Sequence, residues 1–258
     1  MQTYYFEPTG LADLRELAQA YVASLSSPID SFLEEHILAS QPYRILAGKE
    51  TIGYCAVHEQ KLLTQFYIEP RFLAQGQAVF WEILARLQVE SAFVPTCDEL
   101  FLSHALEHQS AIEFQAYFFV DRPEIEVGHR LYQGGRFRVA VEDDALEIER
   151  VALEFFDRLA ERIARQEIFV LVKDGVLLGV GIIESSRLLT SHTSIGMFTV
   201  EKFRRRGIGR AILVNLKRWC YARDQLPIAG CWYYNHASKK TLESVGMVSR
   251  TRLLHIHL

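Results

Sequence analysis

The sequence has few cysteines and few prolines, and the cysteine pattern in particular restricts the class of protein. Of its 258 residues only 4 are cysteine and 7 are proline. The cysteines lie far apart, without the paired spacing of a zinc site or a disulfide framework. They are Cys55, Cys97, Cys220 and Cys231. We therefore expect a reduced, cytoplasmic protein that holds no metal.

Long apolar runs, a targeting signal and an excess of one charge are also lacking. No apolar stretch approaches the roughly 20 residues of a membrane-spanning helix. Residues 1–5 do not show the basic-then-apolar pattern of a signal peptide. The formal net charge is −4 and 49% of the residues are hydrophobic, which is typical of a soluble globular protein. We therefore expect no membrane association and no general nucleic-acid binding.

The most informative stretch that is present runs from residue 197 to residue 221. Residues 197–200 are mostly β-branched or aromatic, which predicts a short strand. Three consecutive arginines follow, and apolar side chains then recur at helical spacing. These apolar residues are Ile208, Ile212, Leu216 and Cys220. The stretch is therefore predicted to be a strand, a basic turn that contains glycine, and a helix.

Two glycines and the start of this helix together predict an anion-binding site. Gly207 and Gly209 lack a Cβ atom, so the backbone can turn sharply there and approach a ligand closely. The first N–H groups of a helix have no partner inside it and carry the positive end of the macrodipole. Because the neighbouring arginines add charged donors, we predict a site for a pyrophosphate. An ordinary solvated basic helix start is the alternative interpretation.

The six residues Arg204-Arg205-Arg206-Gly207-Ile208-Gly209 resemble the acyl-CoA-binding loop of the GCN5-related N-acetyltransferase (GNAT) superfamily, Arg/Gln-x-x-Gly-x-Gly/Ala. The phosphate loops of nucleotide-binding proteins do not fit, because their glycines and lysine have a different spacing. The resemblance implies that an acetyl group passes directly from acetyl-CoA to a primary amine in a ternary complex. The amine is expected on a small molecule or a peptide, which the sequence does not identify.

The resemblance also implies which residues bind acetyl-CoA. Backbone groups of the strand would bond the pantetheine arm, and amides of the loop would bond the pyrophosphate. The motif Asn-x-x-Ser further along the chain resembles the second CoA-contacting segment of the family. The cofactor-binding residues implied in this way are Phe198, Thr199, Val200, Arg204, Arg205, Arg206, Gly207, Ile208, Gly209, Arg210, Asn235 and Ser238.

Proton transfer in such a reaction needs a base for the amine and an acid for the leaving thiolate. Glu184 is the first candidate for the base and His192 the second, although either could be merely structural. The tyrosine that the family often carries seven residues after the asparagine is Leu242 here. Tyr233 or Tyr234 could take its place as the acid, with packing on the sheet as the alternative; Tyr234 is our candidate.

The order of expected elements repeats in the two halves of the chain, on either side of a charged, Gly- and Pro-containing connector at residues 121–135. In the second half, Lys173-Asp174-Gly175 predicts a hairpin between strands at residues 168–172 and 176–184. Residues 68–78 align with residues 199–209, so that Gly76 and Ala78 match the two loop glycines. Leu73, however, stands where the second copy has an arginine. The first copy therefore keeps the turn and loses the charge.

The predicted fold class is α/β (α+β), with two GNAT-like domains. Each is expected to be a mixed, mostly antiparallel central sheet flanked by helices. We predict a degenerate domain at residues 1–128 and an acyl-CoA-binding domain at residues 129–258. Since a tandem pair can imitate the dimer of single-domain relatives, a monomer or a homodimer is expected.

Three functions are compatible with these patterns. The leading hypothesis is an acetyl-CoA-dependent N-acyltransferase. A non-catalytic CoA-sensing or protein-interaction module is the second, because the usual tyrosine is missing and the first copy is degraded. Nucleic-acid binding through the three arginines is the weakest, since the basic residues are confined to one turn without interleaved aromatic residues.

Overall fold

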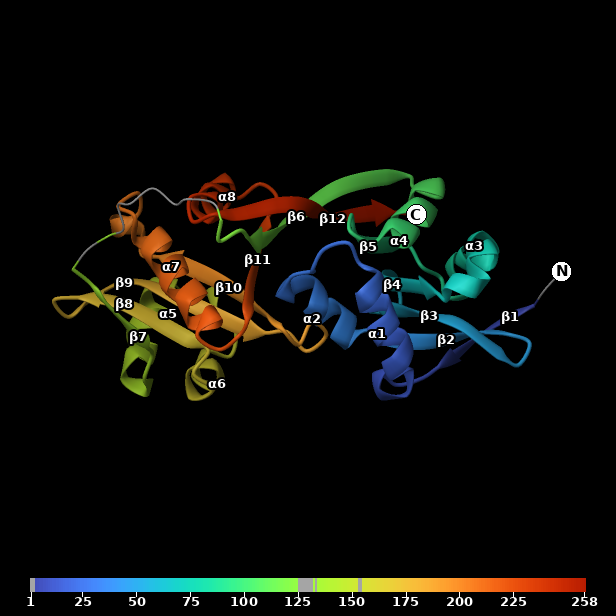
Figure 1. Cartoon of the computed structure of the whole chain (residues 1–258), viewed down its shortest axis with the longest axis horizontal. Helices are drawn as coiled ribbons and strands as arrows, with labels where there is room; N and C mark the ends of the chain where they lie inside the picture. The colour runs from blue at the N-terminus through green and yellow to red at the C-terminus, as the bar shows by residue number, and fades with distance from the viewer. Residues whose placement is uncertain (1–2, 125–131, 133, 153–154) are drawn as a thin grey trace. The chain divides into compact units, whose positions relative to one another are not determined.

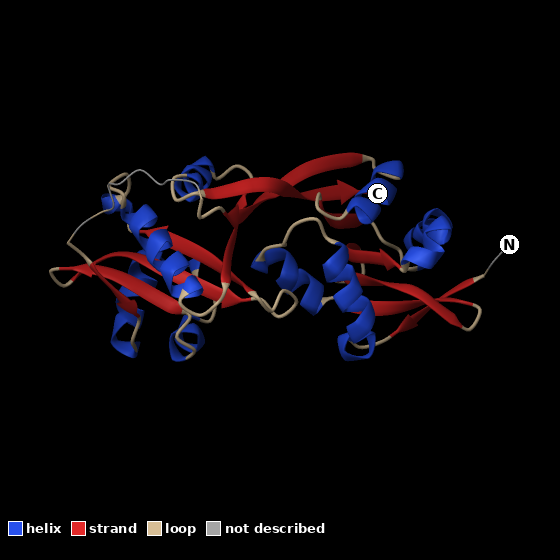
Figure 2. Ribbon diagram, viewed as in Figure 1, coloured by secondary structure: helices blue, strands red, loops and turns tan. Residues whose placement is uncertain are grey.

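The computed structural model describes residues 3–124, 132, 134–152 and 155–258. The chain divides into two compact units, drawn in Figures 1 and 2. Unit 1 comprises Met1–Phe118 and Arg250–Leu258, and unit 2 comprises Phe119–Ser249. Within the described residues, none of the helices is long and apolar enough to cross a membrane.

Unit 1 is built on a mixed sheet in the order β1-β2-β3-β4-β5-β12-β6. The neighbours β1 to β4 pair antiparallel, β4 and β5 pair parallel, and β5 and β12 pair antiparallel. The strands are β1 (Tyr4–Pro8), β2 (Gln41–Ala47), β3 (Glu50–His58), β4 (Leu62–Ile68), β5 (Ser91–Pro95), β6 (Ala111–Asp121) and β12 (Met247–His257). The helices are η1 (Leu11–Leu14), α1 (Arg15–Ser24), α2 (Ser31–Ala39), η2 (Pro70–Gln75), α3 (Gly76–Arg86) and α4 (Glu99–Glu107).

Side chains of successive residues in the strands of unit 1 point to opposite faces of the sheet and pack into two separate hydrophobic clusters. Phe66 of β4 packs with Phe80 of α3 and Phe101 of α4 in the larger cluster. The next residue, Tyr67, packs in a second cluster with Tyr21 of α1. Since successive side chains of a strand point to opposite faces, α3 and α4 cover one face of the sheet and α1 covers the other.

Unit 2 repeats this plan in the order β6-β11-β10-β9-β8-β7. Its strands are β7 (Arg136–Val139), β8 (Ile168–Lys173), β9 (Val176–Ser185), β10 (His192–Thr199) and β11 (Leu226–Trp232). Its helices are η3 (Glu142–Asp144), α5 (Ala145–Ala152), α6 (Leu159–Ala164), η5 (Glu201–Phe203), α7 (Ile208–Tyr221) and α8 (His236–Glu243). The expected hairpin between β8 and β9 is present, and its turn residues Asp174 and Gly175 have φ of 50° and 77°. The predicted fold class is confirmed.

Glycines let helix α7 pack closely on the sheet of unit 2. A Cβ atom on Gly181 would lie 2.9 Å from Cγ2 of Ile212, so a larger residue there would displace the helix. Val180, between the glycines of β9, points to the opposite face and joins the core formed with α5 and α6. The sheet of unit 2 is therefore covered by α7 on one face and by α5 and α6 on the other.

The end of the chain is placed differently from the predicted domains. Residues 129–258 were expected to form one domain, but Arg250–Leu258 belongs to unit 1. The reason is strand pairing, because β12 pairs with β5 from Leu253↔Pro95 to His257↔Ser91. The predicted boundary between residues 128 and 129 lies outside the described residues and stays a prediction.

Candidate functional site

Strands β10 and β11 of unit 2 are paired only where they begin. The parallel register ends at Ser194↔Ile228, whereas β10 stays paired with β9 on its other side as far as Thr199↔Gly179. The C-terminal half of β10 therefore has one edge that no strand of the described chain pairs with. Such an edge offers backbone donors and acceptors to an extended ligand.

The register decides which residues of this edge can serve a ligand. The N–H of Val200 donates to the carbonyl of Leu178 on the β9 side, at 3.1 Å. By the alternation of an antiparallel ladder, the N–H of Phe198 also faces β9, and those of Met197 and Thr199 face the open edge. Of the residues predicted to bind CoA through their backbone, only Thr199 thus presents its N–H at the open edge. Met197 also does so, and it was not among the residues predicted from the sequence. The sequence does not show which alternate residues of β10 point their N–H groups to the open edge, because this depends on the pairing of β9 with β10.

The predicted helix start after the basic turn is present. Gly207 precedes α7 with a left-handed φ of 81°, and no side chain caps the helix. The first intrahelical bond runs from the N–H of Ala211 to the carbonyl of Gly207, at 3.0 Å. The N–H groups of Ile208 and Gly209 therefore have no partner inside the helix. They lie just beyond the end of β10, where the macrodipole favours an anion.

The two loop glycines have different roles in this geometry. The nearest atoms to a Cβ built on Gly207 lie 3.9 Å away, so space is open there and the positive φ alone requires glycine. A Cβ on Gly209 would lie 3.1 Å from Sδ of Met197 and 3.3 Å from Cγ2 of Thr241. Gly209 thus lets α7 pack against β10 and α8, and Ile208 beside it has a buried side chain.

The arginines of the turn carry positive charge at the surface. Arg204, Arg205 and Arg206 are exposed, and no ion pair to a described residue engages any of them. Arg204 donates from Nε to the carbonyl of Thr199 at 3.3 Å, and Arg206 lies over the ring of Phe203 at 5.7 Å. These guanidinium groups therefore keep most of their donors available for an anion.

The second predicted CoA segment begins helix α8. Oδ1 of Asn235 accepts from the backbone N–H of Ser238 at 3.0 Å, so the two residues form an N-cap. The packing of Thr241 against Gly209 places α8 beside the start of α7. The side-chain amide of Asn235 is exposed and keeps its own donors.

The candidate acid lies where β11 ends. The side chain of Tyr234 is 55% exposed, and its ring contacts those of Trp232 and Tyr233 at centroid distances of 5.1 and 5.2 Å. Leu242, at the position of the usual tyrosine, is 3% exposed and belongs to the interior. Of the two candidate tyrosines, Tyr234 is therefore the more exposed, since Tyr233 is half-buried.

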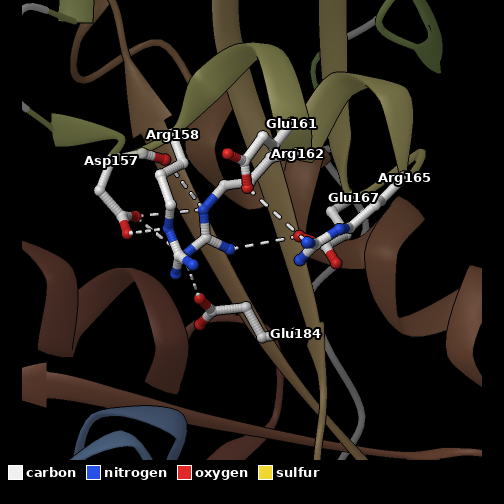
Figure 3. A network of polar contacts seen from close by, with 7 residues as sticks. All are labelled: Asp157, Arg158, Glu161, Arg162, Arg165, Glu167 and Glu184. Atoms are coloured by element: carbon white, nitrogen blue, oxygen red, sulfur yellow. Dashed lines mark hydrogen bonds and ion pairs between the residues drawn. The ribbon is translucent and has the colours of Figure 1, made fainter.

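The first candidate base, Glu184, takes part in an ion-pair network (Figure 3). Nη2 of Arg162 lies 2.9 Å from Oε1 of Glu184 and 2.9 Å from Oδ1 of Asp157, and Nη1 of Arg162 lies 3.4 Å from Oε2 of Glu167. The Arg162 side chain is only 9% exposed. Burial acts to raise the pKa of Asp157, but the hydrogen bonds and positive charges of Arg162 and Arg158 together outweigh it, so the pKa is lowered. Glu184 is thus held in place by its ion pair with Arg162.

Both candidate bases lie near the closed end of the separated strands. Glu184 is in register with Ser194, the last residue of β10 that pairs with β11. His192 lies two residues earlier, and its Nδ1 is 3.1 Å from Oγ of Ser191. Burial lowers the pKa of His192, which favours the neutral imidazole. Thr199 is five residues beyond Ser194, or about 16 Å along an extended strand. The candidate bases and the start of α7 therefore lie near opposite ends of the unpaired edge of β10.

Unit 1 has the same separation of strands but a different helix start. β4 and β5 pair only at Leu62↔Ser91 and Leu63↔Ala92. Gly76 at the start of α3 has an ordinary helical φ of −52°, and Nε2 of His104 would lie 2.8 Å from a Cβ built on it. An imidazole from α4 thus packs directly against this helix start.

Two family models match the sequence. One, described as "Acetyltransferase (GNAT) domain", matches residues 10–122, and the other, "Acetyltransferase (GNAT) family", matches residues 135–247. Each match covers one of the two repeated halves. No curated protein matches the sequence.

Several solved structures share the fold over nearly the whole chain. An acetyltransferase of the GNAT family from Colwellia psychrerythraea is 20% identical with a TM-score of 0.88, covering 99% of both chains. A GCN5-related N-acetyltransferase from Sphaerobacter thermophilus is 16% identical with a TM-score of 0.66, covering 98% of this chain and 95% of that one. A tandem GNAT protein from the clavulanic acid biosynthesis pathway is 13% identical with a TM-score of 0.65, covering 99% and 98%. Identities this low establish the fold alone.

Proposed function

The chain belongs to the GNAT superfamily of acetyltransferases and carries two GNAT domains in tandem. From this membership we propose that it transfers the acetyl group of acetyl-CoA to a primary amine. The GNAT fold implies acetyl-CoA as the co-substrate. We place the reaction in unit 2. The observation that supports this choice is the open edge of β10, which leads directly to the uncapped, arginine-flanked start of α7.

In this proposal acetyl-CoA lies along the unpaired edge of β10, with its pyrophosphate at one end and its thioester at the other. The N–H groups of Ile208 and Gly209 bind the pyrophosphate, and the exposed arginines of the turn neutralise its charge. The backbone of Thr199 and Met197 bonds the pantetheine amides as an added strand would. The thioester then lies toward Ser194, where the strands close.

The chemical step requires that charge on the thioester oxygen be stabilised as the amine attacks. The N–H of Met197, the nearer to the closed end of the two open-edge donors, is suited to donate to this oxyanion. Glu184, opposite Ser194, accepts the proton of the amine directly or through water, and neutral His192 is the second candidate. Tyr234 protonates the thiolate that leaves.

Turnover against a panel of amines tests this function. Release of free CoA thiol that depends on the amine, together with an acetylated product found by mass spectrometry, is the expected result. The buried Leu242 at the usual tyrosine position favours the second candidate function, a CoA-binding module without catalysis. Saturable acetyl-CoA binding without turnover of any amine would support that module and contradict the enzyme.

A further inference from the structure

Three potential metal ligands converge on neighbouring strands of unit 1, away from the residues assigned above. His255 and His257 lie two apart on β12, so both side chains are on the same face of the strand. Glu113 of β6 reaches them from the adjacent strand. One ligand atom from each residue can be chosen so that all three lie within 4.8 Å of one another. In the part of the chain that the structure describes, no other group of three such residues meets this condition.

One of the two contacts between Glu113 and the histidines has the ligand spacing of a tetrahedral ion, and the other is longer. Oε1 of Glu113 lies 3.4 Å from Nε2 of His257, and Oε2 lies 4.0 Å from Nδ1 of His255. Ligands of tetrahedral zinc are about 3.4 Å apart, because the bonds to nitrogen and oxygen are about 2.1 Å long. Two imidazoles and one carboxylate with a position left for water are a donor set that zinc and similar ions accept.

The strands hold the two imidazoles in place. β12 pairs with β5 through His255↔Phe93 and His257↔Ser91. On its other side, the carbonyl of His257 accepts from the N–H of Ser110 at 2.8 Å. The ring of Phe93 contacts that of His255 edge-on at 5.1 Å and restricts its rotation. Such support of the ligands is what metal sites in proteins require.

We propose that Glu113, His255 and His257 bind one divalent transition-metal ion of the zinc class. The site departs from the expectation, drawn from cysteine spacing alone, that the chain holds no metal. Because its ligands come from β6 and β12, the ion joins the last strand of the chain to its neighbour in unit 1. Binding to the folded state alone therefore raises the stability of unit 1.

Calorimetric titration of the chelator-treated full chain with Zn²⁺ tests the site. One ion per chain is expected, with a rise in the unfolding temperature that a chelator reverses. His257→Gln and Glu113→Gln should each lower the affinity roughly 10- to 100-fold or more, since loss of a direct ligand weakens binding at least as much as loss of a group that supports one. Co²⁺ should give a visible absorption band in the wild type that both variants lose.

A matched control separates this site from adventitious binding to surface histidines. His236 is exposed on α8, so His236→Gln should leave the Zn²⁺ affinity and the Co²⁺ band unchanged. Glu113→Gln changes a side chain that is 65% exposed, so a loss of binding there is not a loss of folding. Equal Zn²⁺ affinity in the wild type and both ligand variants, or no saturable binding by the wild type, would overturn the proposal and leave an ordinary surface ion pair.

Discussion

Asp98 of unit 1 makes the stability of this protein depend on pH in a predictable direction. Its Oδ1 caps helix α4 by accepting from the N–H of Phe101 at 3.0 Å. Burial raises the pKa of Asp98 from 3.8 to about 6, although hydrogen bonds from the N–H of Phe101 and the hydroxyl of Tyr21 offset part of this effect. The folded state thus holds the proton of Asp98 more tightly than the unfolded state does.

The size of this effect on stability follows from the difference between a pKa of 3.8 in the unfolded chain and one of about 6 in the folded protein. One pKa unit corresponds to about 1.4 kcal/mol, so the stabilising contribution of protonated Asp98 is about 3 kcal/mol. That contribution is fully present below pH 3.8 and is lost as the pH rises through 6. Asp98→Asn removes the charge and keeps an oxygen for the cap. Relative to the wild type, the variant should gain up to about 3 kcal/mol of unfolding free energy between pH 4 and pH 7.

Urea denaturation can isolate this effect in unit 1. Trp81 is the one tryptophan of that unit. Trp219→Phe and Trp232→Phe, introduced into both the wild type and Asp98→Asn, leave the fluorescence of Trp81 as the reporter of unfolding. Asp13→Asn, which removes an exposed carboxylate of the same unit, is the control. A free-energy difference between Asp98→Asn and the wild type that stays constant from pH 4 to pH 7 would refute the reasoning.

Three further predictions concern unit 2. Arg204→Ala with Arg206→Ala should weaken acetyl-CoA binding about 100-fold in calorimetry, because charged hydrogen bonds contribute about 1.5–3 kcal/mol each; the exposed Arg218→Ala is the control, and an equal loss there would contradict a specific loop. Gly209→Val should lower the unfolding free energy of unit 2 by about 1–3 kcal/mol, since its side chain would meet β10 and α8; unchanged thermal unfolding would disprove this packing. Glu184→Gln should lower kcat about 100-fold or more and remove a limb of the pH–rate profile, and an unaltered profile would exclude Glu184 as the base.

Local patterns in the sequence predicted much of unit 2. The hairpin turn at Asp174-Gly175 and the start of α7 after Gly207 appear where they were expected. Both depend on the conformational preferences of a few adjacent residues, which sequence displays directly. The charge of the turn was also readable, because its arginines project to the surface and need no partner from a distant element.

Long-range pairing explains what the sequence did not reveal. Whether Phe198 or Met197 presents its N–H to a ligand depends on the register of β10 against β9, which a shift of one residue would reverse. Likewise, the end of the chain joins unit 1 because β12 pairs with β5, and this pairing also brings the two histidines of β12 to Glu113. The ion pair of Glu184 with Arg162 joins two elements far apart in sequence and was equally hidden.

Calorimetric titration of the full chain with acetyl-CoA tests the central claim most directly, because it gives affinity and stoichiometry together. One site per chain is expected, strongly weakened by the Arg204→Ala/Arg206→Ala change and unaffected by Leu73→Ala in unit 1, which changes a side chain that is 47% exposed. Two sites would contradict the assignment of the cofactor to unit 2 alone, and an absence of binding would contradict the proposed transferase.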